Sequence, residues 1–277
     1  MNTIPPQRYG RLLLTGAAGG IGRVLRPRLT AHARAVRLSD LPGPLQAHVT
    51  DPGPHEEIVP CDIADRAAFD RLAAGCDAVV HLGGVSVERP FEEILEANIK
   101  GLFNLYEAAR RNGVRRVVFA SSNHVTGFHR QDEIIDARAP RRPDGYYGIS
   151  KSFGEDMAQF YFDRYGIETA SIRIGSLFPE PTDLRMLSTW ISLDDFDALL
   201  RACLYTPDIG HTVVYGVSAN RTVWWDNRHA ARLGYAPRDC AESFRAKIEA
   251  QPAPAPGDPL LTLQGGRFTA MGPFEPQ

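Results

Sequence analysis

Cysteine is scarce in this chain of 277 residues, which has four: Cys61, Cys76, Cys203 and Cys240. None of them stands at the short paired spacing of a zinc site, so no metal is predicted. A disulfide framework is equally unexpected, because scattered thiols in a chain of this length are typical of proteins from a reducing compartment. We therefore expect a cytoplasmic protein.

Long apolar runs and a charge excess are also missing. No stretch approaches the ~20 apolar residues that a membrane span requires. The segment RLLLTGAAGGIG is too short for a signal-peptide core and is broken by glycines. The net charge is −2 and the basic residues form no stripe, which argues against nucleic-acid binding. We expect neither a membrane nor a nucleic-acid partner.

What the chain does contain is an alternation of apolar runs and amphipathic segments as far as residue 175. The hydrophobic fraction of 43% and the charged fraction of 23% are ordinary for a globular protein. Helices are predicted at 20–32, 65–75, 91–112 and 146–165. Strands are predicted at 11–16, 35–40, 56–62, 77–84, 115–122 and 168–175.

These strands are continuous Val, Ile and Leu runs, which are typical of a parallel sheet buried on both faces. Strands that alternate with helices predict an α/β, Rossmann-like doubly wound fold. We expect residues 1–175 to form this doubly wound domain and residues 176–277 to form a small cap packed on it. In the cap, a helix at 192–205, a strand at 212–218 and a short helix at 224–234 are predicted. The Pro-rich stretch QPAPAPGDP is expected to be a surface linker that ends regular structure.

The turn TGAAGGIG predicts a dinucleotide site. Gly16, Gly19 and Gly22 allow a tight turn and close approach to a pyrophosphate, while the following helix presents N–H groups to it. Asp40 ends the second strand, 18 residues after Gly22, and can accept hydrogen bonds from the ribose hydroxyls. Its carboxylate would repel the 2′-phosphate of NADP, so NAD is predicted. Asp62 either meets the adenine or caps the next helix, for which Asp65 is the better candidate.

The stretch DGYYGISKSFGE places Tyr147 and Lys151 four residues apart, on one face of a helix. Ser122 precedes Tyr147 by 25 residues, at the end of a predicted strand. A free phenol, with a pKa near ~10, is a weak base at neutral pH, and an adjacent ammonium lowers that value. We therefore predict that Lys151 lowers the pKa of Tyr147. Tyr146, the rival phenol, is out of register by one residue.

Taken as a set, these motifs resemble the extended short-chain dehydrogenase/reductase superfamily over residues 10–205. The segments HLGGVSVERPFEEIL, FASSNHVTG, RIGS, PEP, RMLSTW and WWDN are similar to the uronate dehydrogenase family across nearly the whole chain. This resemblance implies NAD-linked oxidation of D-galacturonate or D-glucuronate at C1 to an aldarolactone. The residues before Arg11 look like an extension, to which we attach no function.

The resemblance also implies roles for particular residues. Ser122, Tyr147 and Lys151 would be catalytic, and Asn98 would relay protons to Lys151, although local backbone contacts alone would also explain a buried Asn. NAD would meet Gly16, Gly19, Gly20, Ile21, Gly22, Asp40, Asp62, Ile63, Leu82, Gly83, Gly84, Tyr147, Lys151 and Ile174. The sugar acid would meet Ser86, Ser122, Asn123, His124, Tyr147, Ser176 and Arg185. From the residues alone, Arg185 would be interpreted as a partner in a surface salt bridge, and His124 would be interpreted as a structural side chain.

Two other functions use the same residues. A nucleotide-sugar epimerase or dehydratase of the extended type shares the Ser-Tyr-Lys set, but generally needs a larger C-terminal domain. A non-catalytic NAD-sensing regulator shares the fold, but such proteins often lack the Tyr and Lys that are intact here. A homo-oligomer is expected, because helices like those at 91–112 and 146–165 often form dimer faces in this superfamily.

Overall fold

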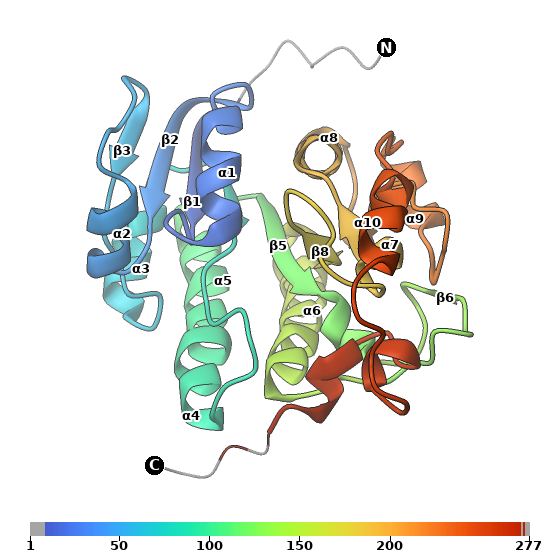
Figure 1. Ribbon diagram of the computed structural model, residues 1–277. Helices are drawn as coiled ribbons and strands as arrows, with labels where there is room; N and C mark the ends of the chain where they lie inside the picture. Colours follow the sequence, from blue (N-terminus) through green and yellow to red (C-terminus); the bar gives the residue numbers. More distant parts are fainter. Residues whose placement is uncertain (1–8, 273, 275–277) are drawn as a thin grey trace.

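A computed structural model describes residues 9–272 and residue 274 of the chain (Figure 1). Its centre is a sheet of seven parallel strands in the order β10-β7-β5-β4-β1-β2-β3. Their bounds are Tyr9–Thr15 (β1), Ala33–Ser39 (β2), Glu56–Ile58 (β3), Ala78–His81 (β4), Arg116–Ser122 (β5), Glu168–Ile174 (β7) and His211–Gly216 (β10). The predicted Rossmann-like, doubly wound α/β fold is confirmed. The extension predicted before Arg11 lies, up to residue 8, outside the described residues.

Helices cover both faces of this sheet (Figure 1). Leu12 and Leu14 of β1 face a core shared with α1 and α8, whereas Leu13 faces a second core shared with α3, α5 and α6. Alternate residues of one strand thus enter opposite cores, which explains why the strand is apolar throughout. The bounds are Gly20–Leu29 (α1), Pro42–His48 (α2), Arg66–Ala73 (α3), Gly101–Asn112 (α5), Tyr146–Tyr165 (α6) and Leu193–Tyr205 (α8).

Shorter elements follow or interrupt these. Two small parallel sheets, β6 with β11 and β8 with β9, lie outside the main sheet. The short helices are Phe91–Ile94 (α4), Leu95–Lys100 (η1), Asn123–Thr126 (η2), Met186–Thr189 (α7), Arg228–Arg232 (α9), Ala241–Phe244 (η3), Arg245–Glu249 (α10), Pro259–Leu261 (η4) and Gly266–Ala270 (η5). The short strands are Ile135–Asp136 (β6), Ser176–Leu177 (β8), Trp190–Ile191 (β9) and Trp225–Asp226 (β11). In the part of the chain described, no helix combines the length and apolarity that a membrane span needs.

The order of the strands reverses next to β1, which predicts a ligand crevice beyond the carboxyl ends of β1 and β4. The chain runs outward from β1 through β2 to β3 and then returns to place β4 on the other side of β1. At such a switch the connections leave in opposite directions, so a gap opens beyond the carboxyl ends of the two strands. The glycine turn after β1 and the segment after β4 both lie at this crevice. The boundary predicted at residue 175 falls between β7 and β8, and β10 from the second segment completes the sheet.

Most predicted elements are confirmed, but several bounds differ. The third strand is shorter than predicted and ends at Ile58, although the N–H groups of Val59 and Cys61 still donate to the carbonyls of Leu38 and Asp40 at 2.9 and 3.0 Å. The helix predicted at 20–32 ends at Leu29, and the segment predicted as a helix from 224 begins with the strand β11. Helix α2 was not predicted. The helix predicted at 91–112 is continuous, but its middle, η1, is a π-helical turn rather than α-helix.

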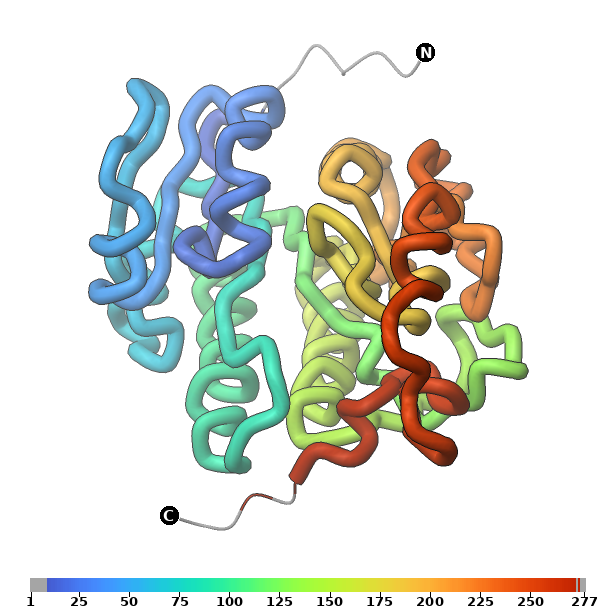
Figure 2. The backbone as a smooth tube through the Cα atoms, viewed as in Figure 1, coloured from blue at the N-terminus to red at the C-terminus, as the bar shows by residue number. Residues whose placement is uncertain are grey.

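The C-terminal region corrects one prediction. Regular structure does not end at the Pro-rich stretch, because the short helices η4 and η5 follow it. We call residues 258–270 the C-terminal strap. Figure 2 shows this red segment returning beside the N-terminal end of α6. The sequence has no periodic pattern there, so the prediction rested on the prolines alone, and prolines report on local backbone rather than on distant contacts.

Candidate active site

The turn after β1 carries the glycines predicted to bind a dinucleotide. Gly16 has a φ of 72°, and a side-chain carbon on it would lie 2.6 Å from the backbone carbon of Leu82. Only glycine therefore lets the ends of β1 and β4 approach this closely. Gly19 is the N-cap of α1 and provides no side-chain cap. The first N–H groups of the helix, from Gly20, Ile21 and Gly22, are thus available to a phosphate.

Asp40 faces this turn from the neighbouring strand. Its carboxylate accepts hydrogen bonds from the N–H of Ala18 at 2.9 Å and from the N–H of Leu41 at 2.8 Å. A carboxylate held at the end of β2, beside the glycine turn, fits the ribose hydroxyls of a dinucleotide. The residues present therefore fit NAD.

The segments after β3 and β4 hold further predicted cofactor residues. Asp62 is exposed and accepts from the N–H of Ala64 at 2.9 Å, while Asp65 is the residue that caps α3. The helix-cap alternative for Asp62 is therefore wrong. Leu82, Gly83 and Gly84 follow β4, and Gly83 N–H donates to the hydroxyl of Thr15 at 3.3 Å. Ile63 is half-buried after β3, Ser86 is exposed in the loop after β4, and Ile174 pairs with Ser122 across the sheet.

Tyr147 and Lys151 lie on the buried face of α6, close to the carboxyl end of β5. The hydroxyl of Ser122 lies near enough to the phenol of Tyr147 to lower its pKa. Lys151 Nζ donates to the carbonyl of Ala120 at 2.8 Å and lies 5.5 Å from the centre of the Tyr147 ring. The three predicted catalytic side chains are therefore together at the end of the sheet, whereas Tyr146 is 40% exposed and faces away.

The predicted effect of Lys151 on Tyr147 is wrong for these side-chain positions. Burial raises the pKa of Tyr147 to about 12, and the nearby hydroxyl of Ser122 offsets only part of that rise. Burial also lowers the pKa of Lys151 to about 8. Both shifts arise because an ionised group loses hydration in the interior. Burial is thus the largest cause of both pKa shifts.

Asn98 lies in the π-helical turn η1 and is buried. Its side-chain oxygen accepts from the N–H of Val85 at 2.8 Å, and its amide donates to the carbonyl of Val85 at 3.0 Å and to the hydroxyl of Ser150 at 2.9 Å. Two of these three bonds go to backbone, as the simpler alternative expects. Through them Asn98 ties the loop after β4 to α6.

Glu88 was missed by the sequence reasoning. Its buried carboxylate accepts from the N–H of Tyr146 and from the N–H of Tyr147, both at 2.8 Å. The residue before the helix, Gly145, has no side chain to do this. Glu88 therefore caps the helix that carries the candidate base from a position 58 residues earlier in the chain. No local pattern reveals such a cap, because cap and helix are distant in sequence.

Glu88→Ala is expected to lower the unfolding free energy by roughly 1–2 kcal/mol, because two helical N–H groups lose their acceptor. The midpoint of thermal unfolding should fall by about 2–8 °C. Because the bonded N–H groups belong to the residues around the candidate base, turnover should fall as well. Arg89→Ala, an exposed neighbour, is the control and should change neither measurement. Equal midpoints for Glu88→Ala and the wild type would show that the cap is dispensable.

His124 is held by three neighbours. Its Nδ1 lies 2.7 Å from the buried carboxylate of Asp144, its ring stacks on Phe268 at 3.9 Å, and Tyr147 meets its edge at 5.9 Å. Burial lowers the pKa of His124 despite the carboxylate, so the ring is neutral at pH 7. Nδ1 then carries the proton that Asp144 accepts, which leaves Nε2 as an acceptor. Neither Asp144 nor Phe268 was singled out from the sequence.

Arg185 is buried just before α7. Its Nε donates to the carbonyl of Gln264 at 2.5 Å, and its Nη1 lies 3.5 Å from the hydroxyl of Ser176. Nη2 is buried and has no hydrogen-bond partner among the described residues. The side-chain nitrogen of Asn123 is also buried and has no hydrogen-bond partner among those residues. Burial lowers the pKa of Arg185 to about 10, so it remains a cation at pH 7. A buried cation with a free donor fits an anionic ligand.

The C-terminal strap contacts three of these side chains. A side-chain carbon at Gly265 would collide with the carboxylate of Asp144. Gly266 has a φ of 60°, and a carbon on it would lie 2.7 Å from Cδ of Arg185. Phe268 covers the ring of His124. The one signal in the sequence is the pair of glycines in LQGGRF, which sits outside any predicted turn or linker.

Comparisons with known proteins agree with this site. Residues 12–192 match the NAD dependent epimerase/dehydratase family. The chain is 64% identical over 266 residues to a uronate dehydrogenase of Pseudomonas syringae pv. tomato, covering 96% of this chain and 95% of that one. It is 62% identical to a uronate dehydrogenase of Pseudomonas putida, covering 99% and 100%. A solved structure of a mutant uronate dehydrogenase from Agrobacterium tumefaciens, complexed with NAD, matches with a TM-score of 0.91 at 54% identity, covering 96% of this chain and 99% of that one.

Proposed function

Because this chain belongs to the NAD dependent epimerase/dehydratase family, and within it to the uronate dehydrogenases, we propose that it oxidises D-galacturonate or D-glucuronate at C1 to the aldarolactone. It is an NAD-dependent oxidoreductase. Loss of the hydroxyl proton and of a hydride from C1 turns the cyclic hemiacetal into a lactone. NAD, when bound at the glycine turn and Asp40, supplies the hydride acceptor.

In this proposal, Tyr147 takes the proton of the C1 hydroxyl, and Ser122 donates a hydrogen bond to the same oxygen. The hydroxyl of Ser122 lies near enough to Tyr147 to lower its pKa, so one substrate oxygen can reach both hydroxyls. Lys151 holds positive charge beside the phenol ring and binds the cofactor. Asn98 links α6 to the loop after β4, which carries Ser86. Asn123 and Ser176 bond sugar hydroxyls, and His124 accepts from one through Nε2.

The observation that best supports an acidic substrate is that Nη2 of Arg185 is buried without a hydrogen-bond partner in residues 9–272 and 274. A buried N–H group of a guanidinium that has no acceptor is costly, and a carboxylate at C6 of the sugar would supply an acceptor to Nη2. Arg173, also buried, already forms two bonds of 2.8 Å to Glu155 and is not available. Neutral sugars have no group that would satisfy Arg185 equally well.

The test is a panel of sugars with NAD, followed as NADH absorbance. D-galacturonate and D-glucuronate are expected to reduce NAD, whereas D-galactose and D-glucose should be poor substrates. Turnover of a UDP-sugar without net NADH would favour the epimerase or dehydratase alternative. NAD binding without turnover of any sugar would favour a regulator.

Cofactor choice gives a separate prediction. NAD is expected to be preferred over NADP by about tenfold to a hundredfold in kcat/KM, because Asp40 would face the 2′-phosphate. Asp40→Ala should narrow this gap, and Asp62→Ala, an exposed carboxylate farther along the sheet, should leave it unchanged. Equal kcat/KM for both cofactors in the wild type would contradict the role of Asp40.

We also propose a cytoplasmic homo-oligomer. All four cysteines are free thiols, which suits a reducing compartment. Large apolar side chains are exposed on the helices expected to form a dimer face, namely Phe91, Phe103, Ile149 and Phe160. Light scattering on the purified protein measures its mass directly, and a monomer at micromolar concentration would contradict this expectation.

A further inference from the structure

Gln264, in the C-terminal strap, is buried and uses all of its side-chain hydrogen-bonding groups. Its side-chain oxygen accepts from the indole N–H of Trp225 at 2.9 Å. Its amide nitrogen donates to the carbonyl of Arg130 at 2.9 Å and to the carbonyl of Glu133 at 3.0 Å. The side chain is thus fixed to two separate segments, the loop before β6 and the strand β11.

These side-chain bonds restrict the position of residue 264 as a whole. Its backbone carbonyl accepts a hydrogen bond from Nε of Arg185 at 2.5 Å. A guanidinium is planar, so an acceptor on Nε fixes the direction of the whole fork. Nη1 then lies near Ser176, and Nη2 has no partner in the part of the chain that the structure describes. Gly266, which passes close to Cδ of the same arginine, keeps the strap against it.

We propose that Gln264 is a positioning residue that aims Arg185 at the substrate carboxylate. This inference rests on the proposed function, since it concerns how the same site recognises a uronate. Because Nε is occupied, the carboxylate meets the edge formed by Nη1 and Nη2 and not the edge formed by Nε and Nη2. The strap therefore determines the geometry of acid recognition without touching the reacting carbon.

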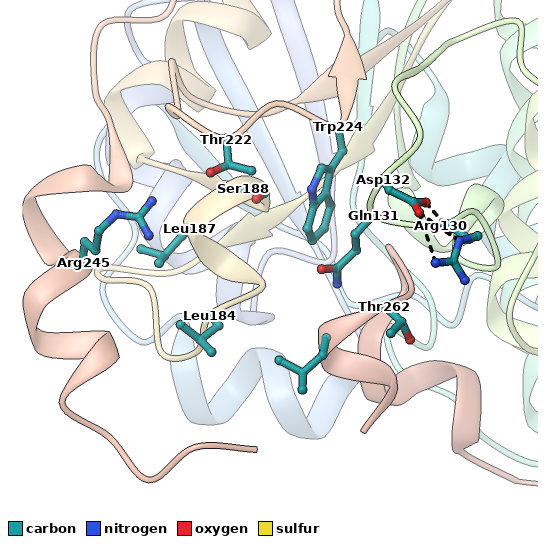
Figure 3. A pocket seen from close by; sticks show the side chains of 11 residues that line it. Arg130, Gln131, Asp132, Leu184, Leu187, Ser188, Thr222, Trp224, Arg245 and Thr262 are labelled. Carbon is teal, nitrogen blue, oxygen red and sulfur yellow. Dashed lines mark hydrogen bonds and ion pairs between the residues drawn. The ribbon is translucent and has the colours of Figure 1, made fainter. Parts of the chain in front are cut away.

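The test compares two glutamines that both fasten the strap. Gln264→Met removes three side-chain bonds around the carbonyl that holds Arg185. Gln131→Met is the matched control. It removes the two hydrogen bonds, of 2.8 and 2.9 Å, that the Gln131 amide donates to the strap carbonyls of Leu260 and Leu263. Figure 3 shows Gln131 beside Trp224 and Thr262, in a cavity of about 400 Å³ that contains none of the predicted site residues.

For Gln264→Met we expect the KM for galacturonate to rise on the order of tenfold, as when a charged group loses a well-placed bond, with kcat within about threefold. The Kd for NAD should not change. Gln131→Met should leave all three values within about twofold of wild type. Equal effects of the two substitutions would assign the role to the strap as a whole and overturn the inference for Gln264.

A double mutant decides whether Gln264 acts through Arg185. If it does, Gln264→Met adds nothing to the loss caused by Arg185→Ala. Additive losses would overturn the inference. If Gln264→Met does not yield folded protein, Trp225→Phe removes one of the three bonds and leaves a smaller aromatic ring to stack on Tyr215. It should raise the KM for galacturonate by about threefold, and an unchanged KM would overturn the inference.

The outcomes separate this inference from the function on which it rests. If the wild type reduces no NAD with any hexuronate, the proposed function and the role of Gln264 are both withdrawn. If the wild type is active and Gln264→Met keeps the wild-type KM, only the role of Gln264 is withdrawn.

Discussion

Tyr147→Phe is expected to lower kcat by about a hundredfold to ten-thousandfold, the usual contribution of a general base. The phenylalanine ring still packs beside His124, but no group remains to accept the hydroxyl proton. The Kd for NAD should stay close to that of the wild type. Stopped-flow or steady-state NADH absorbance measures the first quantity, and calorimetric titration with NAD measures the second.

Tyr146→Phe is the matched control, because it removes the same hydroxyl from the preceding residue of the same helix. Tyr146 is 40% exposed and packs its ring against Phe91, so the loss of its hydroxyl should change kcat by less than about twofold. If Tyr146→Phe proved the more damaging substitution, the base would be the other phenol and the register of the site would be wrong.

The pH dependence of kcat/KM should reflect the ionisation of Tyr147. Burial raises the pKa of Tyr147 to about 12, so the phenolate is the minor form near pH 7. Each increase in pH below that value increases the phenolate fraction, whereas Lys151, with a pKa of about 8, loses its charge above that pH. The value of kcat/KM should therefore rise between pH 7 and pH 8 and level off above it. The residual activity of Tyr147→Phe should lack this rise.

Arg185→Ala is expected to lower kcat/KM for galacturonate by a factor of roughly thirty to several thousand, the effect of removing one partner of a desolvated charged pair. The protein has a net charge of −2, so its overall field does not attract an anion and a local cation must do so. The Kd for NAD should barely change. Arg185→Lys should recover only part of the loss, since an ammonium lacks the planar fork.

The selectivity for acids is the sharper measurement. Galactose has no carboxylate, so its poor turnover should be nearly the same in Arg185→Ala as in the wild type. The ratio of galacturonate to galactose efficiency should therefore collapse. An unchanged ratio would mean that the carboxylate is bound elsewhere, and Arg185 would lose its assignment.

Much of the fold could be predicted from the sequence, because most of its helices and strands are determined by residues close together in the chain. Helix α6 begins and ends as predicted, since Gly166, with a φ of 67°, provides a C-terminal stop that depends on neighbouring residues only. The glycine turn, Tyr147 and Lys151 are likewise local patterns. The pKa of Tyr147 was predicted in the wrong direction, because burial is a property of the packed chain and spacing says nothing of it.

The parts that were missed are contacts between distant, irregular segments. Glu88 caps a helix from a loop, and residues 264–268 reach Asp144, Arg185 and His124 from the far end of the sequence. Neither segment has a periodic hydrophobic pattern. The acceptor at Gln264 is a backbone carbonyl, which every residue has, so the residue type does not reveal it. Such features become visible only when the chain is folded.

The π-helical turn at Leu95–Lys100 has a consequence for insertions and deletions in this chain. A π-turn accommodates one residue more than an α-helical turn, and each residue of an α-helix turns the chain by about 100°. Deleting one residue there would give an uninterrupted α-helix, yet it would rotate one half against the other. Either Asn98 would lose its hydrogen bonds to the backbone of Val85, or the side chains of Leu102 and Leu105 would turn out of the hydrophobic core. This stretch should therefore tolerate changes of residue type far better than a change of length.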